Sequence, residues 1–155
     1  MNSGARISLD SNVLIYAVDP RDPVRRASAA QIIALAAVVD CVLVPQSIAE
    51  FFHVVTRKGV IAKQEAARQV GRWLGIFTLT AGPGGANLSL ACSAAISGRF
   101  QFYDALLVAT AAAAGCTAVI SEDMHPGANL GGARLVAAFD PAGRIGAEAL
   151  ALLGG

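Results

Sequence analysis

The sequence predicts an α/β fold in which helices cover both faces of a parallel β-sheet. Short β-like runs alternate with helical runs, and the β-like runs are continuously apolar, as in strands that are buried on both faces. The composition agrees, because 55% of the 155 residues are hydrophobic, only 15% are charged and the net charge is +1. Such a chain is not disordered and has enough apolar surface for a core.

The N-terminal half is predicted to alternate three short strands with four helices. Asp22 followed by Pro23 is typical of a helix start, and Gly59 ends a later helix. The predicted strands are Arg6–Leu9, Cys41–Val44 and Ile76–Thr80. The predicted helices lie at about Ser11–Val18, Pro23–Val38, Pro45–Lys58 and Lys63–Leu74.

The C-terminal half is predicted to contain two further helices and two further strands. Gly115 ends the second of these helices. Residues 122–132 form a loop, and the tail after Asp140 forms a loosely docked helix. The predicted helices are Asn87–Ser97 and Tyr103–Ala114, and the predicted strands are Thr117–Ser121 and Ala133–Ala138.

We predict a single domain over residues 1–155, with a core at about 6–140 and a C-terminal tail at 141–155. The uncharged stretches Trp73–Gly98 and Ala105–Ser121 are too broken by glycine and polar residues to give the ~20 apolar residues of a membrane span. Asp10 interrupts any signal-peptide pattern. The expected location is the cytoplasm, with three reduced core thiols, Cys41, Cys92 and Cys116.

Five carboxylates lie inside or beside apolar segments, where a charge is costly unless it is paired, hydrogen-bonded or bound to a metal. They are Asp10, Glu50, Asp104, Glu122 and Asp123. Asp10 directly follows the first predicted strand, and Asp123 follows the strand that ends at Ser121. Ligands bind at the carboxyl ends of strands in such sheets, so we expect several of these acids to converge there.

Each acid also has a possible local role. Asp10 and Asp104 could cap helices, Glu50 could form a capping box with Ser47, and Asp123 could organise a turn. One shared site explains all four placements more simply. Carboxylates that share a site repel one another, and a hard divalent cation such as Mg²⁺ or Mn²⁺ removes that conflict. Hydrolysis of a phosphodiester fits such a centre.

Four segments of the chain resemble the acidic motifs of PIN domains. They are "LDSNVLIYA", "AEFFHVVTR", "YDALLVATAAAAGC" and "ISEDM". The small single-domain form is similar to VapC-type ribonuclease toxins of type II toxin–antitoxin pairs, and the resemblance covers roughly residues 6–140. It implies a three-layer α/β/α sandwich with a central parallel sheet, and cleavage of single-stranded RNA with Mg²⁺ or Mn²⁺.

The resemblance also implies a role for each matched residue. The four acidic positions correspond to residues that are catalytic and bind the metal, namely Asp10, Glu50, Asp104 and Asp123. Among them, Glu50 would complete a site whose other three members hold metal directly or through water. The supporting positions are Asn12, which would steady Asp10, Ser121, which would contact a ligand water, and Glu122, which is ancillary.

Basic residues are few, so we expect RNA to be contacted by a small set, Arg57, Lys58, Arg72 and Arg99. His125 lies in a glycine-rich loop, where it is either a substrate contact or incidental. The resemblance implies two protein partners, an antitoxin whose flexible segment covers the acids, often with an arginine, and a second copy of this chain. The candidate dimer surface, which is equally a candidate for the core, is Ile48, Phe51, Phe52 and Val55.

Other functions remain as alternatives. A non-catalytic binding or assembly module could share this fold, although a degenerate site would be expected to lack one of the four acids. A PIN nuclease with a role outside toxin–antitoxin systems is another. A haloacid-type phosphatase would need an aspartate where Asn12 stands, and the spacing of Gly82-Pro83-Gly84-Gly85 does not match a phosphate-binding loop.

Overall fold

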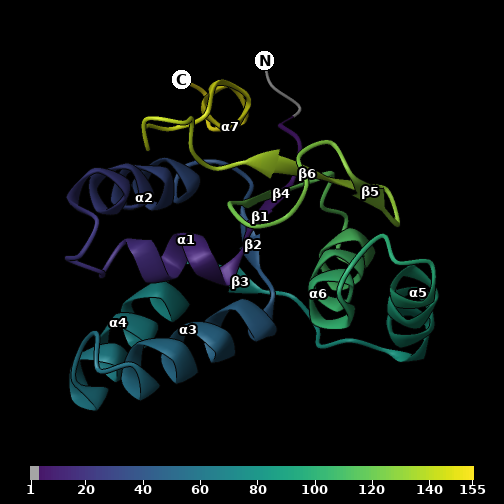
Figure 1. Cartoon of the computed structure of the whole chain (residues 1–155), viewed down its shortest axis with the longest axis horizontal. Coiled ribbons are helices and arrows are strands. Elements are labelled where there is room, and N and C mark those ends of the chain that lie inside the picture. Colours follow the sequence, from purple (N-terminus) through teal and green to yellow (C-terminus); the bar gives the residue numbers. More distant parts are fainter. Residues whose placement is uncertain (1–3) are drawn as a thin grey trace.

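The computed structural model describes residues 4–155, so residues 1–3 of the predicted domain lie outside the described part. It contains six short strands and seven helices in alternation (Figure 1). The strands are β1 Ile7–Leu9, β2 Val42–Leu43, β3 Thr78–Leu79, β4 Ala118–Ser121, β5 Asn129–Leu130 and β6 Ala133–Ala137. The helices are α1 Ser11–Tyr16, α2 Pro23–Ala36, α3 Pro45–Arg57, α4 Lys63–Ile76, α5 Gly85–Ile96, α6 Phe102–Ala113 and α7 Ala147–Leu152.

The strands form two groups that meet at β1. One sheet has the order β1-β4-β6-β5, and β2 pairs with β3 beside it. A single parallel bridge between Ile7 and Cys41 connects β1 to the start of β2, and the Ile7 amide donates to the Asp40 carbonyl at 2.9 Å. The pairs β1–β4, β4–β6 and β2–β3 are parallel, so the carboxyl ends of these strands lie at one edge.

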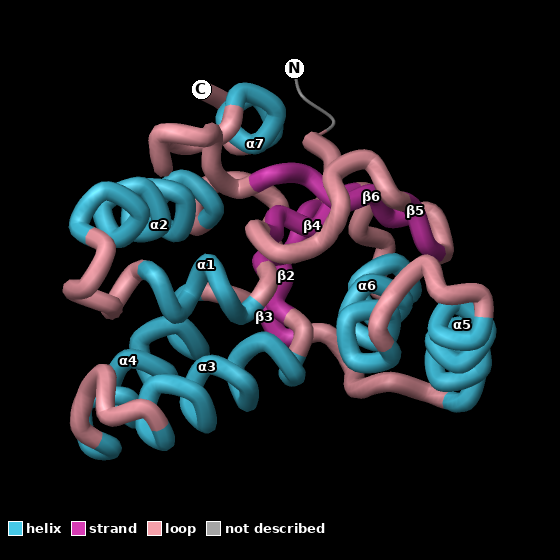
Figure 2. The backbone as a smooth tube through the Cα atoms, viewed as in Figure 1, coloured by secondary structure: helices cyan, strands magenta, loops and turns pink. Residues whose placement is uncertain are grey.

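Helices cover both faces of the sheet, as predicted for a three-layer α/β/α sandwich (Figure 2). Side chains of a strand alternate between the faces. In β4, Ala118 and Ile120 pack into a first core with α1, α2, α3 and α4, whereas Val119 packs into a second core with α5 and α6. The two cores explain why β4 has consecutive apolar residues, Ala118 to Ile120, instead of alternating polar and apolar ones.

One strand pairing differs from the prediction. Residues 122–132 are not entirely loop, because β5 pairs antiparallel with β6 at the edge, which makes the sheet mixed. Gly131 and Gly132 lie between the paired residues Leu130 and Ala133, and both have positive φ, +65° and +98°. A two-residue turn with two positive φ values matches the twist of a hairpin, and glycine adopts it without strain. The strand has only two residues, which is too short for a periodic signal.

Several helix ends follow the sequence signals. The Asp22 side chain accepts a hydrogen bond from the Arg25 amide at 3.0 Å at the start of α2, with Pro23 as the first helical residue. Gly59 and Gly115 follow the ends of α3 and α6 with φ of +65° and +89°. The C-terminal helix α7 is more firmly packed than expected, because Ala149 and the following Leu153 are buried in the first core.

The structure corrects one prediction about the core and decides between two alternatives for α3. Cys92, predicted to be a core thiol, is exposed on α5, whereas Cys41 and Cys116 are buried as expected. The candidate dimer surface is mostly core, because Ile48, Phe51 and Val55 are buried in the first core. The amphipathic pattern of α3 shows that one face is apolar but does not show what covers it; here α1 and α4 do. In the described residues 4–155, no helix combines the length and apolar character needed to cross a membrane.

Replacing Phe51 with alanine is expected to lower the free energy of unfolding by about 3–5 kcal/mol, because it leaves a cavity in the first core. Phe51 is fully buried and its ring meets that of Trp73 edge to face at 4.6 Å between centroids. The next residue, Phe52, is 36% exposed and provides the matched control. Phe52→Ala is expected to cost less than about 1 kcal/mol. Urea denaturation measures both, and equal losses would contradict this assignment.

Candidate active site

Asp10 joins three elements at the carboxyl edge of the sheet. It follows β1 and caps α1, since its Oδ1 accepts a hydrogen bond from the Ser11 amide at 2.7 Å. Its Oδ2 accepts from the Ser121 hydroxyl, at the end of β4, at 2.7 Å. Asp10 is only 6% exposed, yet both of its oxygens are hydrogen-bonded. The capping role and a role in the site are therefore compatible.

Glu50 lies one turn inside α3 and is held on both oxygens. The Ser11 hydroxyl donates to its Oε2 at 2.8 Å, and the Gln46 amide nitrogen donates to its Oε1 at 2.7 Å. The predicted capping box is wrong, because the Ser47 hydroxyl donates instead to the Leu9 carbonyl at 3.0 Å. Ser47 thus fixes α3 to the end of β1, and Glu50 is free to face the other acids.

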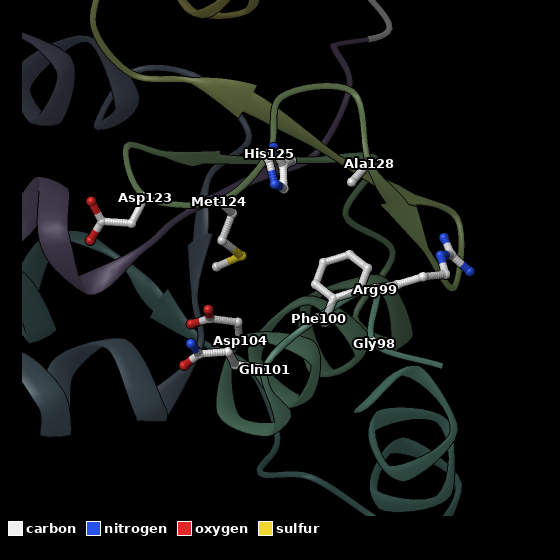
Figure 3. Close-up of a pocket in the computed structure, with 9 residues that line it drawn as sticks. All are labelled: Gly98, Arg99, Phe100, Gln101, Asp104, Asp123, Met124, His125 and Ala128. Atoms are coloured by element: carbon white, nitrogen blue, oxygen red, sulfur yellow. The ribbon is translucent and has the colours of Figure 1, made fainter. Parts of the chain in front are cut away.

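Asp104 and Asp123 line one cavity of about 290 Å³ from opposite sides. Figure 3 shows Asp104 on the first turn of α6 and Asp123 in the loop after β4. Asp104 is not the N-cap that the sequence suggested, since Gln101 occupies that position. Both Asp10 and Asp104 lie at helix N-termini, where the partial positive charge of the helix favours a carboxylate.

The supporting residues predicted from the sequence lie beside Asp10. Asn12 donates to Asp10 Oδ2 at 3.4 Å and accepts from the Glu122 amide at 3.3 Å, which ties α1 to the loop after β4. Glu122 itself accepts from the Tyr16 hydroxyl at 3.0 Å, and its other oxygen lies 4.0 Å from Arg25 Nε. Its carboxylate is therefore engaged by α1 and α2, which agrees with an ancillary place.

Burial and mutual repulsion raise the pKa values of two acids. Burial is the main reason that the pKa of Asp10 rises from 3.8 to about 6; the charges of Glu50 and Asp104 add to it, while the bonds from Ser121 and Ser11 oppose it. Partial burial, followed by the charges of Glu50 and Asp123, raises the pKa of Asp104. The charges of neighbouring acids thus act on Asp10 and Asp104, in addition to burial.

The donor set suits Mg²⁺ or Mn²⁺, because it offers carboxylate, amide and hydroxyl oxygens. A divalent cation would also relieve the raised pKa values of Asp10 and Asp104. Within residues 4–155, no three His, Cys, Asp or Glu side chains lie close enough together to enclose an ion in their present positions. Mg²⁺ commonly uses one or two carboxylates and keeps several waters, so these residues fit an ion held by part of the cluster.

The four predicted RNA contacts lie in different places. Arg99 lines the cavity that contains Asp104 and Asp123. Arg57 and Lys58 lie at the far end of α3, about 10 Å along the helix from Glu50, and Lys58 lines another cavity with Asp19. Arg72, on α4, forms an ion pair with Glu65 at 3.2 Å. Of the four, Arg99 is the one that lines the same cavity as Asp104 and Asp123, although its guanidinium points away from them (Figure 3).

Two residues of the site were missed by the sequence analysis. Ser11 links Asp10 to Glu50, and Gln46 links Glu50 to the Tyr103 carbonyl on α6 at 3.0 Å. Ser11 lies inside the first acidic motif and Gln46 is four residues before Glu50, one helical turn away. These positions, next to Asp10 and one helical turn from Glu50, are the sequence signals that could have identified Ser11 and Gln46.

The comparisons with known proteins decide the family. No curated protein sequence matches the chain at a significant level. The family described as PIN domain matches residues 7–125, which is more than half of the chain. The chain belongs to the PIN domain family. The matched segment runs from β1 to just beyond Asp123, so it includes the four acids of the site.

Solved structures similar to this PIN domain come from several bacteria. The VapBC2 complex of Rickettsia felis, bound to promoter DNA, matches with 14% identity, a TM-score of 0.61, and coverage of 84% of this chain and 97% of that chain. VapC20 of Mycobacterium tuberculosis, described as a sarcin–ricin loop cleaving toxin, matches with 13% identity, a TM-score of 0.57 and coverage of 73% and 86%. FitAcB of Neisseria gonorrhoeae matches with 20% identity, a TM-score of 0.50 and coverage of 76% and 87%. At these identities, the likeness is one of fold.

Replacing Asp10 with asparagine is expected to stabilise this PIN domain by about 1–3 kcal/mol at neutral pH when no metal is bound. The raised pKa of Asp10 means that its charge opposes folding, and asparagine keeps an oxygen for the Ser11 amide without the charge. Urea denaturation in EDTA measures the gain. The control is Asp40→Asn, which changes an acid that pairs with Arg6 at 3.2 Å and is largely exposed.

The stability that D10N gains over the parent should depend on pH. Below about pH 4, Asp10 is protonated in both the folded and the unfolded chain. The free energies of unfolding of the parent and of D10N should therefore change with pH in the same way in this range. Between about pH 4 and pH 6 the unfolded chain releases this proton first, so the parent loses stability relative to D10N as the pH rises. A gain that is the same at pH 4 and pH 7 would show that repulsion and burial of the charge are not its cause.

Proposed function

We propose that this PIN domain is a metal-dependent endoribonuclease that hydrolyses phosphodiester bonds in single-stranded RNA. The observation that supports it best is that Asp104 and Asp123 line one cavity, while Asp10 and Glu50 are joined through Ser11. Burial raises the pKa values of Asp10 and Asp104, and the charges of neighbouring acids add to the rise. Such a cluster is costly in a folded protein unless cations bind to it. Mg²⁺ or Mn²⁺ is the cofactor that these oxygen donors favour.

In this proposal, the chain's own residues orient the acids that bind the cation. Ser121 and the Ser11 amide hold Asp10, while Ser11 and Gln46 hold Glu50. Asp104 and Asp123 line the neighbouring cavity from opposite sides. When bound, the cation supplies positive charge that polarises the phosphodiester and eases deprotonation of the attacking water. Glu50, whose oxygens both accept hydrogen bonds, is fixed in a position from which it can orient that water.

We further propose that this nuclease is the cytoplasmic toxin of a toxin–antitoxin pair and forms a homodimer. Similar folds occur in VapBC and FitAB complexes, including the Rickettsia felis complex and FitAcB, and this likeness supports a protein antitoxin as partner. The acid cluster suits an arginine from such a partner, because guanidinium pairs with carboxylates through two hydrogen bonds. A nuclease outside such systems would have the same chemistry without that partner.

Asp104→Asn is expected to lower the rate of RNA cleavage in Mg²⁺ or Mn²⁺ by about 100-fold or more, the scale on which one assisting group acts. The substitution keeps the shape of the side chain and removes its charge. Asp40→Asn is the matched control, because Asp40 pairs with Arg6 away from the cavity. Cleavage of a labelled single-stranded RNA by purified protein gives the rates.

A second measurement tests for the metal separately from activity. Millimolar Mn²⁺ should raise the melting temperature of the parent, because a ligand that binds the folded state stabilises it. The D104N variant should gain less, and D40N should gain as much as the parent. A parent that shows neither cleavage nor a metal-dependent shift, when free of any partner, would instead indicate a non-catalytic binding or assembly module.

A further inference from the structure

The cavity beside the acids extends well beyond them. Its lining combines the acids Asp104 and Asp123 with a second end that is aromatic, basic and apolar. The residues of this second end are Arg99, Phe100, Met124, His125 and Ala128, whereas Gln101 lies beside Asp104. Two segments provide them, the turn between α5 and α6 and the loop after β4 (Figure 3). A site that only bound a metal would have no use for this second end.

Phe100 and Met124 form facing walls of this end. Figure 3 shows the Phe100 ring on one side of the cavity and the Met124 side chain entering it from the loop after β4. Met124 is buried and Phe100 is half-buried, so both are held by the second core. The Arg99 guanidinium lies over the Phe100 ring at 5.9 Å and donates to the Asn129 carbonyl at 2.8 Å. This bond ties the turn to β5 and so fixes the ring relative to the loop.

We propose that this cavity binds one unpaired nucleotide of the RNA, with its base against Phe100 and its phosphate toward Asp104 and Asp123. The inference rests on the proposed nuclease function and names the part of the substrate that enters the site. An aromatic ring stacks on any base, and the acids at the other end lie where a cation would meet the adjoining phosphate. Arg99 and His125 are the basic groups at the rim.

The size and position of the cavity support a single unpaired nucleotide. About 290 Å³ is at the lower end of the ~300–1,000 Å³ typical of small-ligand sites, so it suits one nucleotide better than a folded segment. A base that is paired and stacked in a helix does not offer its face to a side chain. Stacking on Phe100 would therefore select single-stranded RNA without reading its sequence through hydrogen bonds.

Binding is tested directly with a fluorescent reporter at the proposed contact. The chain has one tryptophan, Trp73, which is buried in the first core, so Phe100→Trp adds a second one at the cavity. The titration uses penta-adenylate and the double variant F100W D104N, in which turnover is expected to be slowed by about 100-fold or more. Saturable quenching of the added tryptophan, and little quenching by a blunt RNA duplex, are expected. Absence of quenching by penta-adenylate overturns the proposal, as does equal quenching by the duplex.

Catalysis provides the second test. Phe100→Ala should lower kcat/KM for single-stranded RNA by about 5- to 150-fold, the range that stacking of one base covers, and Phe100→Trp should restore it. Phe139→Ala is the matched control, because Phe139 is also half-buried beneath an arginine, with Arg25 5.8 Å from its ring, but packs against the first core. Equal losses in F100A and F139A, after melting curves show that both are folded, would overturn the proposal.

The two experiments separate this inference from the nuclease proposal. If the parent cleaves RNA but F100W D104N is not quenched, the nuclease function holds and the nucleotide site does not. If the parent fails to cleave RNA but F100W D104N is quenched by penta-adenylate and not by the duplex, the cavity binds unpaired RNA without chemistry. The second result keeps the nucleotide site and rejects the nuclease.

Discussion

The buried carboxylate of Asp10 is the constraint on which the rest of the site depends. One oxygen accepts a hydrogen bond from the Ser11 amide and so caps the start of α1. The other accepts a hydrogen bond from the Ser121 hydroxyl at the end of β4. Through Ser11 it is connected to Glu50 on α3. A group with so little contact with water must be fully hydrogen-bonded, and here those bonds are the ones that align the elements. The same burial raises its pKa, so the charge of this residue also affects the free energy of folding.

The sequence predicted the architecture well because the signals were local. The helical spacing of apolar residues and the Asp22-Pro23 pair predicted α2 and its Asp22 cap. Glycines with positive φ follow the ends of α3 and α6, as expected. The placement of Asp10 and Asp123 after strands predicted that both lie at the carboxyl edge of the sheet, and in the structure Asp123 lines a cavity there together with Asp104 of α6. These inferences needed only the rule that parallel strands end at one edge.

What the sequence could not predict depends on tertiary packing. The apolar face of α3 suggested equally a dimer surface and a core, and only the packing of α1 and α4 against it distinguishes them. The hydroxyl of Ser47 had a plausible partner in Glu50 but bonds to the Leu9 carbonyl across the sheet. The acids also lack a closed cage for an ion among residues 4–155, and no spacing in the sequence reports such distances.

The single bridge between Ile7 and Cys41 makes a seam through the middle of the sheet. Glu50, on α3, belongs to the part that follows β2, whereas Asp10 and the loop that carries Asp123 belong to the part built on β1 and β4. The first core nevertheless packs residues from both parts together, among them Leu9 of β1, Leu43 of β2 and Phe51 of α3. Two serine hydroxyls cross the seam: Ser11 donates to Glu50 at 2.8 Å and Ser47 donates to the Leu9 carbonyl at 3.0 Å, so the distance between Glu50 and Asp10 depends on both.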